Sequence, residues 1–274
     1  MPLPKHADGI IHGEDWDTLV DSVEWQPYSY IIYTEGGTYY AKNGSTGVID
    51  YSGADASTVI QAAHDGLPNG GKIFITASVV GSYSGTLVIE NSNIQLLGAT
   101  GNQLTHTGTG SAILVNGTVG AYIENVMIDG LHIIGSGGAE EDLIAAQYGN
   151  NVVVKNCILE NSREEGVVYY DCTYSKILNN YFDNCGTDAT NPSVEVKDNG
   201  GGNPCYGNRV EGNIILNSPH MGIQVTSSKI DVLNNIVYNP LQGVADEGTH
   251  CAGIWVSPVE INPIEDVRVS GNTV

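Results

Sequence analysis

The side chains best suited to bind or transform a ligand gather around four short strands in the second half of the chain. In each strand a Gly or Ser precedes alternating apolar residues, as in residues 222–225 and 253–256. Alternation turns the apolar residues inward and their neighbours outward. An outward Trp can stack on a sugar ring, while carboxylates, amides and histidines bond hydroxyl groups. The residues that we expect to contact a glycan are Tyr170, Glu195, Gln224, Trp255 and His250.

Carboxylates on or beside these strands allow two further kinds of site. A glycosidase needs two carboxyl groups about 5 to 9 Å apart across the bond that is cut. Glu165 with Glu195, or Glu195 with Asp198, can supply such a pair. The same three residues are candidates to hold calcium, because neighbouring turns of stacked strands lie about 4.8 Å apart. Surface carboxylates that bind nothing are the competing interpretation, and no other cofactor is expected.

These strands belong to a repeat that begins near residue 126. Each unit contains an apolar residue, an Asn or Gly at a bend, a short strand and a second Asn, as in residues 154–161 and 177–184. One aligned column advances in steps of 26, 23, 33, 22 and 37 residues, and a step near 22 is one turn of a β-solenoid. This column consists of Leu131, Cys157, Asn180, Asn213, Asn235 and Asn272.

The repeat also predicts which side chains face inward and which form ladders. Asn residues at one place in successive turns can hydrogen-bond to the backbone and to each other. A column that fits such a ladder is Asn161, Asn184, Asn217 and Asn239. The side chains expected inside are Val167, Tyr169, Val194, Val196, Ile223, Val225, Ile254 and Val256.

Two turns exceed the 22-residue length by 11 and 15 residues, so they carry long insertions. The insertions are residues 186–192 with 198–207, and residues 240–252 with 258–266. All of them flank the strands that begin with Gly or Ser. Solenoid proteins place function on insertions that wall one face, so we expect the working site there.

The repeat resembles the pectate-lyase-like superfamily, through its Asn-Asn-x-[Ile/Phe/Val]-x-Asn and Gly-Ile-x-Val signatures. The likeness extends upstream to residues 55–67, which read as an amphipathic capping helix, and to a strand at 70–75. It implies an all-β fold, a single-stranded right-handed parallel β-helix over residues 48–274. Residues 269–274 stop in mid-turn, so we expect this β-helix to be incomplete at its C-terminal end.

Polysaccharide lyases and epimerases of this superfamily abstract a proton beside a uronic carboxylate, which needs a base and a cation. The resemblance therefore makes Glu195, Lys197 and His220 the catalytic candidates, with Lys197 or His220 as the base. The chain departs from the family's pattern because no arginine stands at an outward strand position, which weighs against a lyase mechanism. The arginines are Arg163, Arg209 and Arg268.

Residues 1–47 do not fit the repeat. Residues 28–33 and 38–41 read as a β-hairpin. Before them, Trp16, Leu19 and Val20 follow a helical spacing that would form a short amphipathic helix.

This helix lies in the motif Asp-Gly-x-Ile-x-x-Glu-Asp-Trp-x-x-Leu-Val, which resembles the opening of virus tail-fibre and tail-spike proteins. The resemblance implies an attachment segment, in which Trp16, Leu19 and Val20 contact other virion structural proteins. A small extension packed on the capping helix is the alternative.

Composition excludes several classes of function. With 31 acidic against 10 basic residues, the chain has a formal charge of −21 and would repel a nucleic-acid backbone. No apolar run is long enough to cross a bilayer, and the first residues lack a secretory signal. The cysteine count is odd, 5, without zinc-type spacing, which favours buried free thiols.

These features together predict a virion tail-fibre or tail-spike protein. Its β-helix would bind host-surface polysaccharide, with or without cleavage, and the chain would form a homo-oligomer such as a trimer. We expect it at the virion surface or outside the cell. One alternative is a free carbohydrate-active enzyme, either a lyase, an epimerase or a glycoside hydrolase acting on acidic polysaccharide. A repeat scaffold without a ligand is the other.

Overall fold

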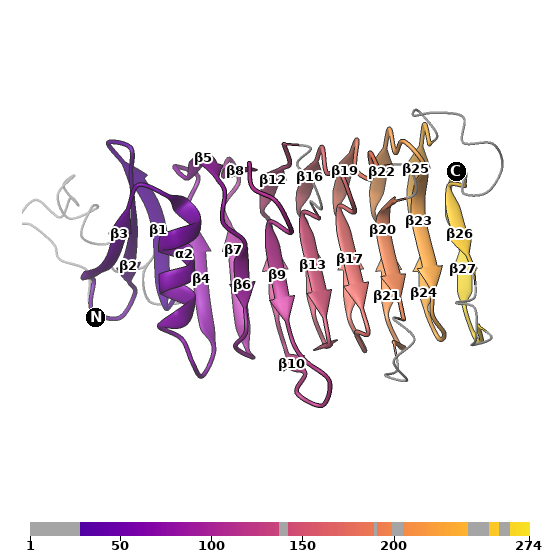
Figure 1. Cartoon of the computed structure of the whole chain (residues 1–274), viewed down its shortest axis with the longest axis horizontal. Coiled ribbons are helices and arrows are strands. Elements are labelled where there is room, and N and C mark those ends of the chain that lie inside the picture. The colour runs from indigo at the N-terminus through magenta and orange to yellow at the C-terminus, as the bar shows by residue number, and fades with distance from the viewer. Residues whose placement is uncertain (1–27, 137–141, 189–190, 199–204, 241–251, 258–263) are drawn as a thin grey trace, which may run out of the picture.

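The computed structural model describes residues 28–136, 142–188, 191–198, 205–240, 252–257 and 264–274. In this part of the chain the backbone winds into a parallel β-solenoid, whose turns stack side by side along one axis (Figure 1). Each full turn gives one strand to each of three sheets, which we name A, B and C. The predicted all-β parallel helix is confirmed.

The sheets are formed by short strands that lie in register from turn to turn. Sheet A has 11 strands: β1 (Tyr30–Glu35), β2 (Thr38–Asn43), β3 (Ile49–Gly53), β4 (Gly71–Ile75), β7 (Ile94–Gly98), β11 (Met127–Asp129), β15 (Val153–Lys155), β18 (Lys176–Leu178), β21 (Arg209–Glu211), β24 (Asp231–Leu233) and β27 (Arg268–Ser270). Sheet B has 7: β5 (Val80–Tyr83), β8 (Gln103–His106), β12 (His132–Ile134), β16 (Ile158–Glu160), β19 (Tyr181–Asp183), β22 (Ile214–Leu216) and β25 (Ile236–Tyr238). Sheet C has 7: β6 (Leu87–Ile89), β9 (Ile113–Asn116), β13 (Ile144–Gln147), β17 (Val167–Tyr170), β20 (Pro192–Lys197), β23 (Met221–Thr226) and β26 (Ile254–Val256). A short parallel pair, β10 (Ile123–Glu124) with β14 (Gly149–Asn150), lies between sheets C and A.

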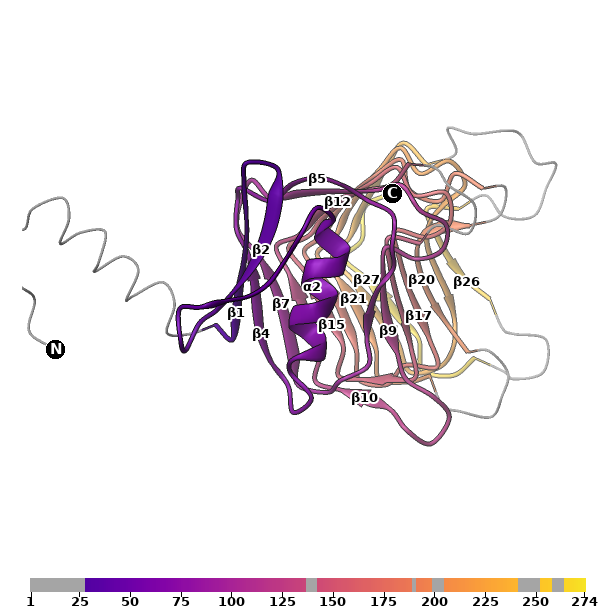
Figure 2. The ribbon, with the colours of Figure 1, turned by 60° about the vertical axis from the view of Figure 1, so that its left-hand side comes forward.

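Helix α2 (Ala56–Asp65) closes the N-terminal end of the solenoid, as the sequence predicts (Figure 2). Asp55 caps it by accepting a hydrogen bond from the Thr58 N–H at 3.0 Å. One apolar face of the helix is buried, where it contacts strands of all three sheets. This buried face consists of Ala56, Val59, Ile60 and Ala63, which are three or four residues apart as on one side of a helix. No helix in the described ranges is long and apolar enough to span a bilayer.

The predicted β-hairpin is also confirmed. Strands β1 and β2 pair antiparallel, and β1 pairs parallel with β4. The described part of the 1–47 segment therefore extends sheet A. Trp16, Leu19 and Val20 lie outside the described residues.

The inward side chains of the three sheets form one continuous hydrophobic core. Six of the eight side chains predicted to face inward on sheet C are fully buried. Tyr169 is among the largest, and its hydroxyl donates a hydrogen bond to the Lys176 carbonyl at 2.9 Å. Ile254 is half-buried and Val256 is 39% exposed, because β26 has a neighbouring strand on one side only.

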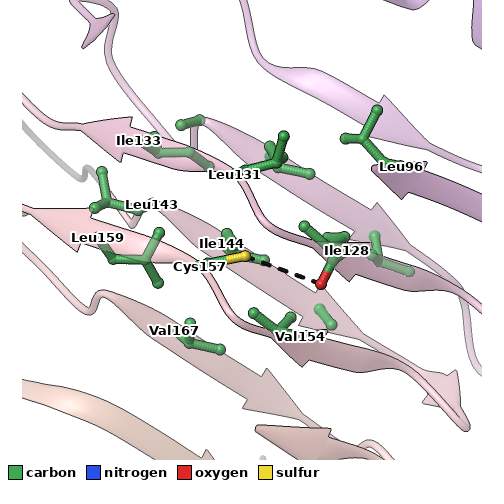
Figure 3. Packing of buried hydrophobic residues seen from close by; sticks show 14 of the residues in the cluster. Leu96, Ile128, Leu131, Ile133, Leu143, Ile144, Val154, Cys157, Leu159 and Val167 are labelled. Carbon is green, nitrogen blue, oxygen red and sulfur yellow. Dashed lines mark hydrogen bonds between the residues drawn. The ribbon is translucent and has the colours of Figure 1, made fainter. Parts of the chain in front are cut away.

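Four cysteines confirm the prediction of buried free thiols, and Cys251 lies outside the described residues. The free thiols are Cys157, Cys172, Cys185 and Cys205. Figure 3 shows Cys157 among stacked aliphatic side chains, with its sulfur 3.9 Å from the Ile128 carbonyl oxygen. Burial raises the pKa of the Cys157 thiol to about 12, so it stays protonated and behaves as a small apolar side chain.

Asn ladders join the turns at two columns: the predicted outer one, and a buried one at the aligned position of the repeat. In the buried ladder, amide nitrogens donate to the amide oxygen of the next turn at 2.9 to 3.0 Å, in the order Asn180, Asn213, Asn235 and Asn272. The outer ladder is interrupted: Asn184 donates to Asn161 and Asn239 to Asn217, but Asn217 donates to Asp183.

Candidate functional site

The outward surface of sheet C carries the predicted site. Strand register places its side chains in two columns that run along the solenoid, with about 4.8 Å between turns. The first column contains Ala145, Val168, Glu195, Gln224 and Trp255. The second contains Gln147, Tyr170, Lys197 and Thr226. We call these two columns the sheet C face.

Glu195 and Lys197 form an ion pair at the centre of the sheet C face. Lys197 Nζ lies 2.6 Å from Glu195 Oε2 and 4.6 Å from the centroid of the Tyr170 ring. Only 6% of the Glu195 side chain is exposed, against 27% of Lys197. A buried carboxylate requires a compensating charge, which the ammonium group supplies.

Lys197 is protonated at neutral pH. Burial acts to lower its pKa, but the negative charges of Glu195, Glu165 and Asp142 outweigh burial and raise the pKa above its ordinary value. A protonated amine cannot abstract a proton, so this environment disfavours Lys197 as a catalytic base. It suits a cation that balances a carboxylate or a negative charge developing on a ligand.

Two acidic side chains lie at the entrance to neighbouring strands of sheet C. Asp142 precedes β13 and Glu165 precedes β17, and both are buried. The Glu165 N–H donates to Asp142 Oδ1 at 3.2 Å, and Ser111 Oγ donates to Asp142 Oδ2 at 3.2 Å. We call Asp142 and Glu165 the acidic pair.

The acidic pair shares a proton. Burial raises the pKa of Glu165 far above its ordinary value, and the hydrogen bond to Asp142 and the charges of Asp142 and Glu195 raise it further. Burial also raises the pKa of Asp142, although hydrogen bonds from Glu165 and Ser111 act in the opposite direction. Glu165 is therefore a neutral carboxylic acid at pH 7, beside an acceptor carboxylate.

Only one of the three predicted calcium candidates lies in the acidic cluster that the described residues contain. That cluster, whose ligand atoms are within 4.8 Å of one another, is Asp142, Glu164 and Glu165. The Glu195 carboxylate is paired with Lys197. Asp198 lies just after the C-terminal end of β20, where its negative charge contributes to raising the pKa of the Cys205 thiol.

The acidic cluster offers three carboxylate groups, whereas calcium takes six to eight oxygen ligands, so a calcium ion there would need further oxygen atoms.

The remaining predicted residues are distributed around the ion pair. Gln224 and Trp255 continue the first column on the next two turns, and both are half-buried. His220 lies just before β23 and is only 3% exposed. His250 lies outside the described residues. Val168 and Glu195 point outward from sheet C and are nevertheless buried, because alternation fixes the direction of a side chain but not the depth of the structure that covers it.

Sequence reasoning missed Asp142 and its partner Ser111. Asp142 is followed by Leu143 at the position where the repeats of β17, β20, β23 and β26 carry Gly or Ser, so it falls outside the recognisable repeat. The available signal was its separation of 23 residues from Glu165, which is one turn.

None of the three arginines reaches the sheet C face. Each pairs with a carboxylate elsewhere: Arg163 with Asp188, Arg209 with Glu211 and Arg268 with Asp231. Among the residues of the two columns, only Lys197 carries a positive charge.

Comparison with known proteins agrees with this architecture. A family model described as "Right handed beta helix region" matches residues 66–274. No curated protein sequence matches the chain.

Solved structures with the same fold include two virus proteins and a carbohydrate-active enzyme. ORF18 of Geobacillus virus E2 has a TM-score of 0.58 at 11% identity, over 88% of this chain and 60% of that one. A tailspike protein of E. coli bacteriophage HK620, in complex with a pentasaccharide, has a TM-score of 0.55 at 16% identity, over 94% and 56%. A polygalacturonase from Erwinia carotovora has a TM-score of 0.53 at 15% identity, over 80% and 73%. The chain thus spans 60% of the virus protein and 56% of the tailspike.

Proposed function

Because the chain belongs to the right-handed β-helix family, we propose that its sheet C face binds polysaccharide, as the glycan-binding surface of a virion tail-fibre or tail-spike protein. The observation that carries this proposal is the Glu195–Lys197 ion pair beside the Tyr170 ring, followed on later turns by Gln224 and Trp255. Charged and amide groups bond sugar hydroxyls, and aromatic rings stack on sugar faces. Columns that repeat at each turn suit an extended polymer.

The similar solved structures support the virion assignment, since two of them are virus proteins and one of these was solved with a pentasaccharide. A homo-oligomer such as a trimer belongs to the same proposal. So does a contact between other virion structural proteins and residues Trp16, Leu19 and Val20. A monomer released into culture medium that produces unsaturated uronides would instead support the free-enzyme alternative.

A double variant tests the sheet C face. Replacing Lys197 alone would strand a buried carboxylate, so Glu195→Gln is combined with Lys197→Met to keep the pair neutral. The full chain is screened on an array of defined oligosaccharides, and the affinity for the strongest binder is measured by titration calorimetry. We expect the double variant to bind that oligosaccharide at least about tenfold more weakly, because it loses charge-assisted hydrogen bonds.

The matched control is Asp129→Asn with Lys155→Met. This pair is also an ion pair between outward side chains, with 3.2 Å between Lys155 Nζ and Asp129 Oδ2, but it lies on sheet A. We expect its binding to stay within about twofold of the unmodified protein, with circular dichroism confirming the fold of both variants. Equal losses in both double variants, or no loss in either, would rule out the sheet C face.

The acidic pair favours hydrolysis as a second candidate function. Glu165 holds the proton that a leaving glycosidic oxygen needs, and the Asp142 carboxylate lies within 4.8 Å of it. A sugar entering between the two groups would have to break their hydrogen bond and part them to the roughly 5 Å of a retaining glycosidase. Glu165 would protonate the oxygen as its bond to the anomeric carbon breaks and Asp142 attacks that carbon. Water would then cleave the glycosyl ester and return a proton to Glu165.

The same oligosaccharide distinguishes binding from cleavage. Release of new reducing ends by the unmodified protein, lost in Glu165→Gln without loss of binding, is the result expected of a hydrolase. Binding without any new reducing ends excludes hydrolysis of that glycan and leaves the sheet C face as a binding surface.

A further inference from the structure

The bend that leads from sheet C into sheet A changes its side chains midway along the solenoid. One position at this bend has a left-handed φ in successive described turns. It is occupied first by Asn93, Asn125 and Asn151, with φ of 63°, 57° and 56°, and then by Tyr174, Gly207, Lys229 and Asp266, with φ of 52°, 71°, 56° and 55°. The Asn side chains form an exposed ladder with amide contacts of 3.1 and 2.9 Å.

Asn and Gly tolerate this backbone conformation better than Tyr or Lys do. Asn is therefore the structurally favourable residue at this position. The turns that carry Tyr174 and Lys229 there lack both the tolerant residue and the ladder. Residues held in an unfavourable backbone region point to a functional role for their side chains.

Beside these residues lies an open pocket of about 410 Å³ on a different surface from the sheet C face. Three basic side chains line it, namely Lys176, Arg209 and Lys229, together with the carboxylates of Asp231 and Asp266. Strands β18, β21 and β24 place Lys176, Arg209 and Asp231 side by side on neighbouring turns. We call these five side chains the cationic pocket.

The carboxylate contributed by β24 is already neutralised. Arg268 donates from Nε and Nη2 to the two oxygens of Asp231, at 2.9 Å each. Lys176 and Lys229 are exposed and make no ion pair with any described residue. Arg209 pairs through Nη2 with Glu211, while its Nε has no hydrogen-bond acceptor in the described part of the chain.

Unpaired positive charge is unusual for this protein. The chain has only 10 basic residues against 31 acidic ones, and four of the basic residues, Lys176, Arg209, Lys229 and Arg268, lie on these adjoining turns, opposite the three carboxylates of Glu211, Asp231 and Asp266. An anionic group in the cationic pocket would gain ion pairs and avoid the repulsion that the rest of the molecule imposes.

An aromatic platform adjoins the cationic pocket. Tyr174 is 52% exposed, and its ring meets the ring of Tyr206 edge to face at 5.2 Å between centroids. A Cβ atom at Gly207 would lie 2.8 Å from the Tyr174 ring, so glycine leaves space for the ring at this bend. An exposed ring beside cations suits a sugar that carries an acidic group.

We propose that the cationic pocket binds an acidic sugar unit, with Lys176, Arg209 and Lys229 holding its carboxylate or sulfate group and Tyr174 contacting the sugar ring. This second subsite lies on the bend into sheet A and would hold an acidic polysaccharide at a place separate from the sheet C face. That the ligand is a saccharide rests on the proposed function. That it is an anion rests on the cationic pocket alone.

The test is titration calorimetry of the full chain at low ionic strength with four probes: trigalacturonate, maltotriose, sulfated maltotriose and sodium sulfate. We expect an acidic trisaccharide to bind at least tenfold more tightly than both maltotriose and sodium sulfate. Lys176→Met with Lys229→Met should weaken that binding at least tenfold. Tyr174→Ala should weaken the binding of the acidic trisaccharide but not the binding of sodium sulfate.

The matched control is Lys72→Met with Lys155→Met, which removes two outward lysines from the same sheet and the same amount of charge. We expect it to change the affinity less than twofold. Equal losses in the two double variants would overturn the proposal, as would sulfate binding as tightly as the trisaccharides, or no binding of either acidic trisaccharide. If the sheet C double variant binds normally, the proposal for the sheet C face fails but that for the cationic pocket stands. If the Lys176 and Lys229 double variant binds normally, the proposal for the cationic pocket fails but that for the sheet C face stands.

Discussion

Glu195 and Lys197 depend on each other because the Glu195 carboxylate is almost completely buried and Lys197 is the cation beside it. If the lysine were removed, the Glu195 carboxylate would remain buried beside the acidic pair, with no cation to balance it. An uncompensated buried charge destabilises a fold strongly, whereas neutralising both partners is much less disruptive. The function of single residues on the sheet C face can therefore be separated from their structural effect only by paired substitutions.

Glu165→Gln should make the stability of the protein less dependent on pH. The folded protein holds a proton on Glu165 that the unfolded chain releases above an ordinary pKa of 4.5, so the free energy of unfolding falls as pH rises above that value. Gln has the shape of the neutral acid and can still donate to Asp142, but it does not titrate. We expect the variant to be more stable than the unmodified protein at pH 8 by about 2 kcal/mol, and by much less at pH 5. Urea unfolding at each pH measures both values.

The control for this prediction is Glu90→Gln, which neutralises an exposed carboxylate that accepts a hydrogen bond from Asn116. Its stability should follow pH in parallel with the unmodified protein. If Glu165→Gln also gave a parallel curve, the shared proton between Glu165 and Asp142 would be disproved.

The turns between sheets A and B are held by the buried Asn ladder. Asn213 is fully buried, accepts from the Asn180 N–H at 2.9 Å and donates to the Ile177 carbonyl at 2.9 Å. Its amide thus satisfies backbone groups of the turn before it, which short strands of three residues cannot pair by themselves. The ladder is consequently a structural element rather than a binding site.

Asn213→Ala should destabilise the protein strongly. It leaves at least two buried polar groups without partners, and each such group costs about 1–3 kcal/mol. We expect the free energy of unfolding to fall by about 3 kcal/mol, measured by urea unfolding.

Asn239→Gly is the comparison for the outer ladder. Asn239 is exposed, donates to Asn217 at 3.2 Å and has a φ of 58°, which glycine adopts without strain. Its loss should cost no more than about 1 kcal/mol. Similar losses for the two variants would mean that burial does not distinguish the ladders.

The molecule as a whole carries a charge of −21 on a long, narrow solenoid. Repulsion between like charges destabilises a folded chain, and salt screens that repulsion within about 10 Å at 0.1 M. The same screening weakens an acidic ligand's attraction to the cationic pocket. Salt should therefore affect folding and acidic-glycan binding in opposite directions.

Raising sodium chloride from 0.02 to 0.5 M at pH 7.5 should increase the melting temperature by about 2–5 °C. Differential scanning calorimetry measures the change. Near the isoelectric point of about 4.3 the net charge vanishes, so the same increase in salt should have little effect there. A melting temperature that falls with salt at pH 7.5 would show that favourable ion pairs outweigh the repulsion.

The fold follows from local patterns that the sequence contains. Alternation at Val194 and Val196, the helical spacing after Asp55 and the recurring Asn180 and Asn213 each specify structure through contacts within one turn or between equivalent positions of neighbouring turns. A repeat makes these contacts predictable even when individual strands have only three residues. The outward direction of Glu195 and Lys197 was predictable for the same reason.

The chemistry of the site depended on the tertiary structure. The proton shared by Asp142 and Glu165, the burial of Glu195 and the grouping of Lys176 with Lys229 depend on how insertions of different length bring turns together and how deeply each group lies. Periodicity gives the direction of a side chain but not its depth below the surface. A pKa and an ion pair are set by distance and solvent exposure, and these are properties of the stacked turns rather than of the pattern that forms each turn.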